Sequence, residues 1–167
     1  MKIVDPKVAD ALKEYIFQSV LATISIFLVL IFLDILEHTA IIATLGASAF
    51  IIFIMPNSYI SLPKQVLGGY IVGIICGWLC FFLMTGFIYF LSFIPEKVFV
   101  VSFGSLAVGT AIFLMAVIDF EHPPAVGVSL GLVLNQWNHQ TIIFIIFALI
   151  IMLVVKKLLQ PVLIDLI

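Results

Sequence analysis

Two short strings of acidic residues and histidine each follow a long apolar run in this sequence. The first string comprises Asp34, Glu37 and His38, and the second comprises Asp119, Glu121 and His122. The Glu-His pairs of the two strings match at one offset of 84 positions. An imidazole can donate or accept a hydrogen bond and gain a proton near neutral pH, and carboxylates can cap helices. Each string could therefore bind a small polar solute or a proton where the apolar pattern breaks.

The residues after each string predict the start of a helix. Pro123 and Pro124 suit the first helical turn, because their missing N–H groups would have no partner there and their φ is fixed near the helical value. The N–H groups of residues 125–127 are then expected to lack carbonyl partners and to favour a small anion. The candidate substrate-binding residues are His38, Thr39, Thr44, Gly46, Ser48, His122, Pro123, Pro124, Ala125, Ser129 and Asn135.

The four carboxylates of the two strings complicate an anion site, because they would repel the substrate. Three interpretations of Asp34, Glu37, Asp119 and Glu121 stay open. They could cap the short helices, relay protons beside the substrate, or lie at the membrane interface in contact with water. As caps they would compete with the substrate for the same backbone donors.

Six apolar segments must position these residues. They run approximately over residues 15–33, 40–55, 66–93, 98–118, 125–134 and 141–155. A helix needs about 20 apolar residues to cross a membrane, and four segments reach that length if the stems of Lys156 and Lys157 extend the sixth. The second and fifth are short and rich in alanine, glycine and serine. We expect these two to be closely packed interior helices.

Composition predicts an integral membrane protein. Hydrophobic residues make up 65% of the 167 positions and charged residues only 10%, and the mean hydropathy is +1.38. We expect one all-α transmembrane domain over residues 1–167, in contact with the lipid bilayer. All seven basic residues are lysines and the net charge is −2, so neither a nucleic-acid surface nor guanidinium recognition of an anion is expected.

The lysines also predict the orientation of the chain. If all six segments cross and the N-terminus is cytoplasmic, only Lys97 lies outside, as the positive-inside rule requires. The halves, about residues 1–93 and 94–167, then hold three crossings each and form an inverted repeat. The two short helices would start from opposite sides and face each other. Because the N-terminal residues match neither a secretory signal nor a transit peptide, we expect a prokaryotic cytoplasmic membrane with both termini cytoplasmic.

Three sequence blocks together resemble a known family. They are Leu45-Gly46-Ala47-Ser48-Ala49-Phe50, then Pro63-Lys64-Gln65-Val66-Leu67-Gly68-Gly69 after Pro56, and finally Glu121-His122-Pro123-Pro124-Ala125. In this order they are similar to the HPP family of integral membrane proteins, over most of residues 40–134. Members in plastids and cyanobacteria are understood as nitrite transporters. The resemblance therefore implies transport of a small inorganic anion, with nitrite as the expected substrate.

Other functions match the sequence less well. No Ser/His/Asp order and no glycine-rich phosphate loop is found, so neither an enzyme nor a cofactor is expected. A metal site is not expected either, and Cys76 and Cys80 suit packing within a helix. An ion or solute channel and a structural or regulatory membrane subunit remain as alternatives.

Two further features concern packing. Gly69, Gly73 and Gly77 recur every four residues, a spacing that permits close helix contact either within the chain or between the subunits of a homodimer. His139 lies in a polar loop beside Trp137 and is expected to be an interfacial residue without a role in transport.

Overall fold

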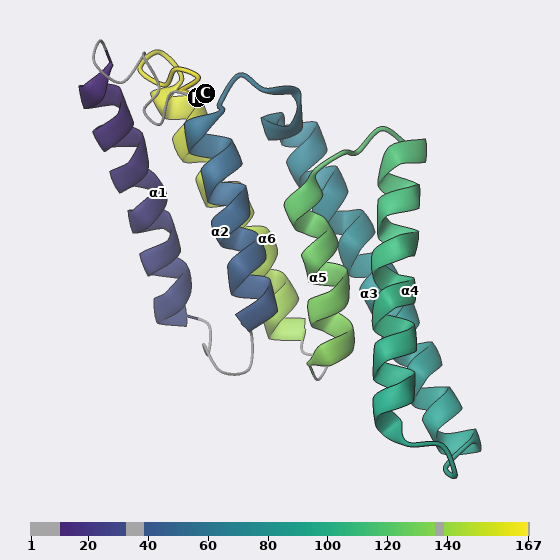
Figure 1. Cartoon of the computed structure of the whole chain (residues 1–167). Coiled ribbons are helices and arrows are strands. Elements are labelled where there is room, and N and C mark those ends of the chain that lie inside the picture. The colour runs from purple at the N-terminus through teal and green to yellow at the C-terminus, as the bar shows by residue number, and fades with distance from the viewer. Residues whose placement is uncertain (1–10, 33–38, 136–138, 167) are drawn as a thin grey trace, which may run out of the picture.

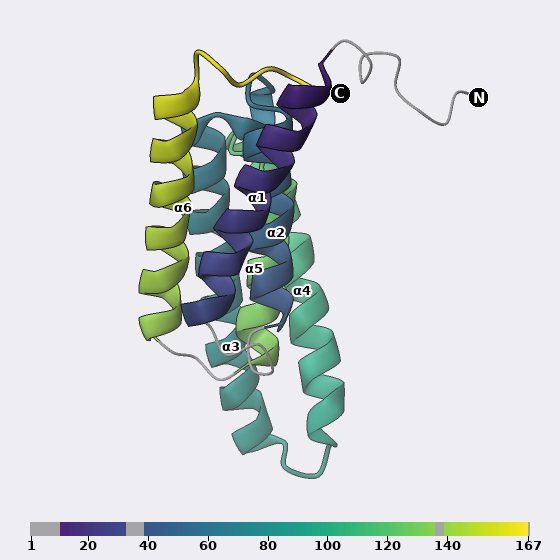
Figure 2. The ribbon, with the colours of Figure 1, turned by 90° about the vertical axis from the view of Figure 1, so that its left-hand side faces the viewer.

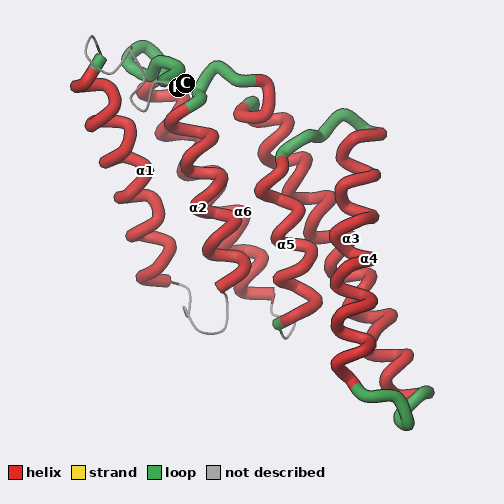
Figure 3. Tube along the Cα trace, viewed as in Figure 1, coloured by secondary structure: helices red, strands yellow, loops and turns green. Residues whose placement is uncertain are grey.

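The computed structural model describes residues 11–32, 39–135 and 139–166, and in these ranges the chain is helical with no strand. The α-helices are α1 (Leu12–Phe32), α2 (Thr39–Ile54), α3 (Pro63–Phe90), α4 (Glu96–Val117), α5 (Pro123–Leu134) and α6 (His139–Leu159), and the 3-10 helix η2 (Tyr59–Ser61) precedes α3. Figures 1 and 3 show the bundle that they form. The all-α prediction with six segments is confirmed.

Helix length separates the six helices into two kinds. α1, α3, α4 and α6 are long and apolar enough to cross a membrane, whereas α2 and α5 are shorter apolar helices. α2 has 16 residues and α5 has 12, which at about 1.5 Å per residue falls short of a hydrocarbon core about 30 Å thick. The predicted shortness of the second and fifth segments is confirmed.

The helices alternate in direction along the chain. The start of α1 and the end of α6 lie at the same end of the bundle, which we call the terminal end (Figures 1 and 2). The connections over residues 55–62 and 118–122 also lie at this end. The turn between α3 and α4 lies at the opposite end, where these two helices extend beyond the others.

The glycines of α3 let α5 approach it closely. A Cβ atom at Gly73 would lie 2.4 Å from the carbonyl oxygen of Ala125, and one at Gly77 would lie 2.7 Å from that of Ser129. A Cβ at Gly69 would lie 2.7 Å from the Cβ of His122. The glycine stripe therefore packs within the chain, and it gives no support to a homodimer.

The other side of α5 packs along α2 in the antiparallel direction. A Cβ at Gly127 would lie 2.3 Å from Cγ2 of Thr44, and one at Gly131 would lie 2.9 Å from Cγ1 of Ile41. The starts of the two short helices thus lie at opposite ends of their contact. The expectation that these starts face each other is wrong, because the small residues let the two helices lie side by side along their length.

Candidate functional site

A chain of three buried polar side chains joins the short helices to α3. His122 immediately precedes α5, Ser48 lies in α2 and Tyr70 lies in α3. The hydroxyl oxygen of Ser48 is 2.9 Å from Nε2 of His122 and 2.8 Å from the hydroxyl of Tyr70. All three side chains have 0% exposure. We call these residues the His122 chain.

The direction of these hydrogen bonds follows from the other nitrogen of the imidazole. Nδ1 of His122 lies 2.8 Å from the carbonyl oxygen of Ile60, which can only accept, so Nδ1 carries the hydrogen. In the neutral ring Nε2 then accepts from Ser48, whose oxygen in turn accepts from Tyr70. Burial lowers the pKa of His122 and outweighs the bond to Ile60, which raises it. The neutral form is therefore favoured.

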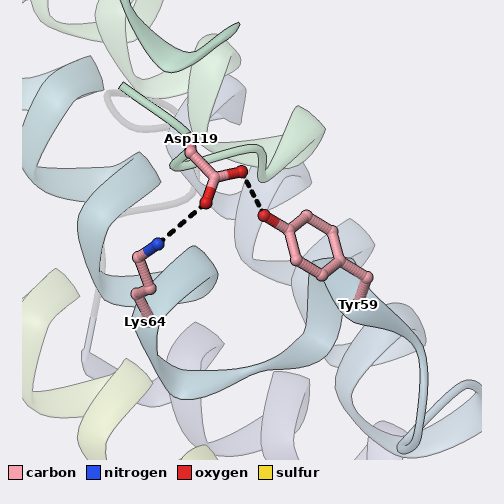
Figure 4. Close-up of polar contacts among 3 residues, drawn as sticks. All are labelled: Tyr59, Lys64 and Asp119. Atoms are coloured by element: carbon pink, nitrogen blue, oxygen red, sulfur yellow. Dashed lines mark hydrogen bonds and ion pairs between the residues drawn. The ribbon is translucent and has the colours of Figure 1, made fainter. Parts of the chain in front are cut away.

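A second polar group lies exposed at the terminal end, at the start of α3. The hydroxyl of Tyr59 donates to Oδ1 of Asp119, and Nζ of Lys64 lies 2.9 Å from Oδ2 of the same carboxylate (Figure 4). These bonds lower the pKa of Asp119, with Tyr59 as the larger cause. The next residue, Phe120, covers Gly68. The connection before α5 is therefore fixed to the start of α3.

The start of α5 lies where the sequence predicts it, at Pro123 and Pro124, but it offers no free donors there. The Ala125 N–H donates to the carbonyl of His122 at 2.9 Å, and helical geometry directs the next two N–H groups to carbonyls four residues back. The prolines occupy the positions whose N–H groups would have been free. The expectation of an anion site at the N–H groups of residues 125–127 is therefore wrong.

The start of α5 also has no side-chain cap. Its N-cap residue is His122, whose ring bonds to Ile60 and Ser48 instead. Asp119 pairs with Lys64 and Tyr59, and Glu121 is exposed. The capping interpretation is therefore wrong for the second string.

Most of the other predicted residues lie apart from the His122 chain. Ser129 and Thr44 are buried, and their hydroxyls donate to Val126 and Ile41 of their own helices at 2.7 Å. Thr44 also lies beside the hydroxyl of Tyr70, so it borders the His122 chain. The Asn135 amide donates to Gly131 at 3.0 Å. Gly46 packs toward Ile26 of α1, and Thr39 is exposed at the start of α2. Asp34, Glu37 and His38 lie outside the described residues.

Four polar residues near the site were not predicted from the sequence. Tyr70 completes the His122 chain, and Gln65 is fully buried in the first turn of α3. Lys156 of α6 donates to the carbonyl of Ser61 at 2.6 Å and to its hydroxyl at 2.9 Å. Ser61 follows Ile60, so α5 and α6 both hold the segment before α3. Of these four residues, only Gln65 could have been noticed in the sequence, because it is a polar residue in the block that ends in Gly68 and Gly69.

A cavity of about 590 Å³ opens beside this segment, between the start of α3 and the end of α6. Its walls include Pro56, Leu67, Leu153, Lys156 and Lys157. No residue of the His122 chain lines it. Among the residues that the structure describes, no group of three or more histidine, cysteine or acidic side chains is placed to hold a metal ion.

Comparison with known proteins gives one match. The family model described as the HPP transmembrane region matches residues 7–163. No curated protein and no solved structure matches the chain.

Proposed function

Since the chain belongs to the HPP transmembrane-region family, we propose that it transports a small monovalent oxyanion, with nitrite as the first substrate to test. The observation that carries this proposal is the His122 chain. Ser48 of α2, Tyr70 of α3 and His122, which immediately precedes α5, have 0% exposure. Polar groups inside a membrane domain are costly, and they commonly mark a substrate or proton pathway.

The arrangement of the short helices supports the proposal. α2 and α5 begin at Thr39 and Pro123, 84 positions apart, and lie antiparallel beside one another. In transporters built from inverted repeats, the substrate site lies between the halves at interrupted helices. We propose that the two halves form such a repeat in a prokaryotic cytoplasmic membrane. The substrate would cross without chemical conversion.

Uptake into proteoliposomes tests this function. We expect purified protein to take up nitrite faster than protein-free liposomes do, with a rate that saturates and with exchange of labelled substrate. Conductance at near-diffusive rates would indicate a channel instead. Transport of a cation but of neither nitrite, nitrate nor formate would contradict the proposal.

Variants of two histidines locate the site. His122→Ala should reduce uptake and its pH dependence together, because it removes the titratable group from the chain. His139→Ala should leave both unchanged, since His139 is an exposed residue at the start of α6. His122→Asn, which retains a side-chain donor toward Ile60, separates a loss of transport from a loss of folding. Full activity in both His122 variants would place the site elsewhere.

A further inference from the structure

Within the described ranges, one fully buried side chain lacks a hydrogen-bond partner at both of its polar atoms. Neither Nε2 nor Oε1 of Gln65 has a partner there, although the residue has 0% exposure. The amide offers two donor hydrogens and one acceptor oxygen. An unpaired buried amide costs free energy, so such a group in a folded protein requires a ligand, a water molecule or another explanation.

Gln65 lies between the two polar groups described above. It precedes Gly69 by one helical turn, so both residues are on the same face of α3. Gly69 is the residue that packs against Cβ of His122 and the carbonyl of Phe120. The Gln65 amide also acts to lower the pKa of Tyr59, against the larger effect of Asp119, which raises it. Gln65 is therefore close to both the exposed Tyr59 group and the His122 chain.

The charges around Gln65 do not suit a bare anion. Lys64 is paired with Asp119, and Lys156 donates to Ser61. The Nε2 atom of neutral His122 accepts a hydrogen bond, and the hydroxyl of Tyr70 donates into the same chain. Glu121 adds a negative charge at the terminal end, and the sequence has no arginine. Among the described residues, both lysines near Gln65 are thus bonded to other groups, and burying an anion without a cation partner carries a large desolvation penalty.

A neutral oxyacid matches the unpaired amide. Nitrous acid and formic acid each carry an O–H donor and an acceptor oxygen on one planar group. The amide N–H can donate to the acceptor oxygen, while the acid O–H donates to the amide oxygen, which satisfies both atoms of Gln65. A bare anion could bond only to the N–H side.

We propose that Gln65 binds the substrate as its neutral oxyacid, that is, the oxyanion together with one proton. This inference rests on the proposed transport of a small oxyanion. Only the O–H bond of the substrate forms and breaks. One anion and one proton enter from one side and leave on the other, so the transport cycle moves no net charge.

Proteoliposomes with independently set pH gradient and membrane potential test the inference. We expect an inward proton gradient to drive nitrite and formate uptake, and a membrane potential alone to leave it unchanged. Gln65→Leu should raise KM by about tenfold or more, the effect of losing a hydrogen bond to substrate. Its thermal stability should be equal or higher, because the variant removes an unpaired polar group. Gln65→Glu should function only at acidic pH, where its carboxyl is protonated.

Gln160→Leu is the matched control, because Gln160 is an exposed glutamine beyond α6. It should retain the KM of the original protein. Uptake driven by membrane potential alone, or an unchanged KM in Gln65→Leu, would overturn the Gln65 inference while leaving oxyanion transport intact.

A binding measurement separates the two proposals. Formate at acidic pH should raise the thermal unfolding temperature of the unmodified protein, but not that of Gln65→Leu. If formate stabilises the protein in this way and no oxyanion is transported, the Gln65 site stands and the proposed function fails. If neither stabilisation nor transport occurs, both proposals fail.

Discussion

Ser48 is the residue on which the His122 chain depends, because its hydroxyl bonds to both other members. Ser48→Ala would leave Nε2 of His122 buried and unpaired, and it would remove one of the two hydroxyls beside the Tyr70 hydroxyl, the other being that of Thr44. An unpaired buried group costs about 1–3 kcal/mol, so we predict a clear fall in the unfolding temperature in detergent. Ser105→Ala is the control, since this exposed serine donates to the carbonyl of Val101 in its own helix. Equal stability of the two variants would contradict the hydrogen bonds of the His122 chain.

Asp119 gives a pH dependence whose direction follows from its bonds. Its pKa is lowered in the folded protein, first by Tyr59 and then by Lys64. The carboxylate therefore adds stability above the ordinary pKa of an aspartate, and this contribution is lost as pH falls through the lowered value. The group is exposed, so the effect is small.

The matched variant for this prediction is Asp119→Asn. Asp119 has a φ of 60°, a left-handed conformation that asparagine also tolerates. The variant should therefore keep the backbone and lose the acid-range pH dependence, measured as unfolding temperature against pH. An identical pH profile in both proteins would show that the pair with Lys64 and Tyr59 adds nothing to stability.

Residue types alone predicted part of the site. His122 stood out because it precedes two prolines, and Ser48 because it lies in a short segment of small residues. Tyr70 could not be found in this way, since it is one aromatic residue among many in apolar segments and its bond to Ser48 depends on how α2 and α3 both pack on α5. The same limit hid Lys156, whose partner Ser61 is 95 positions away.

At the scale of elements, the contact between α3 and α5 requires glycine. Gly73→Ala would place a Cβ 2.4 Å from the backbone oxygen of Ala125, and only separation of the two helices could relieve this overlap. We predict a loss of about 1–3 kcal/mol in the free energy of unfolding. Unfolding in detergent measures it.

Gly109→Ala is the matched control for this contact. Gly109 lies in α4, and a Cβ atom added to it would meet no described residue within 4 Å. Alanine there should therefore be neutral or stabilising by up to about 1 kcal/mol. If Gly73→Ala were as stable as Gly109→Ala, α5 would not pack directly on the glycine stripe.

The sequence predicted the existence, type and length of the helices better than their mutual placement. Hydrophobic runs and the prolines before α3 and α5 mark helix starts through local geometry. Whether α2 and α5 meet end to end or side by side depends on contacts between distant residues, such as Thr44 with Gly127. Because the contact is antiparallel and side by side, Gly127 and Gly131 serve to let α5 pack closely on α2. They do not border a space between two facing helix ends.

At the scale of the whole molecule, the position of the connections predicts labelling from opposite sides of the membrane. The segment with Asn57 lies at the terminal end, and the turn with Ser92 lies at the other end. In a background with Cys76 and Cys80 replaced by alanine, Ser92→Cys should react with an impermeant maleimide on intact cells. Asn57→Cys should react only after permeabilisation, because the lysine distribution places the terminal end in the cytoplasm.

The labelling pattern has one outcome that contradicts the topology. If Asn57→Cys and Ser92→Cys reacted from the same side, the helices could not all cross the membrane. Glu121→Cys is a second reporter for the terminal end, since Glu121 is exposed in the connection before α5. It should follow Asn57→Cys.

The extension of α3 and α4 beyond the other helices has a consequence for the surrounding lipid. α3 has 28 residues, about 42 Å of helix, and its far end carries the strongly exposed Tyr89 and Phe90. On one flank this hairpin favours a thick bilayer or a tilt, whereas α2 and α5 favour a thin one. The protein therefore meets its membrane with opposite hydrophobic mismatches at neighbouring positions. The acyl-chain length of the lipid should therefore change which of the two mismatches is larger. This change should in turn alter how closely α2 and α5 pack in the bundle.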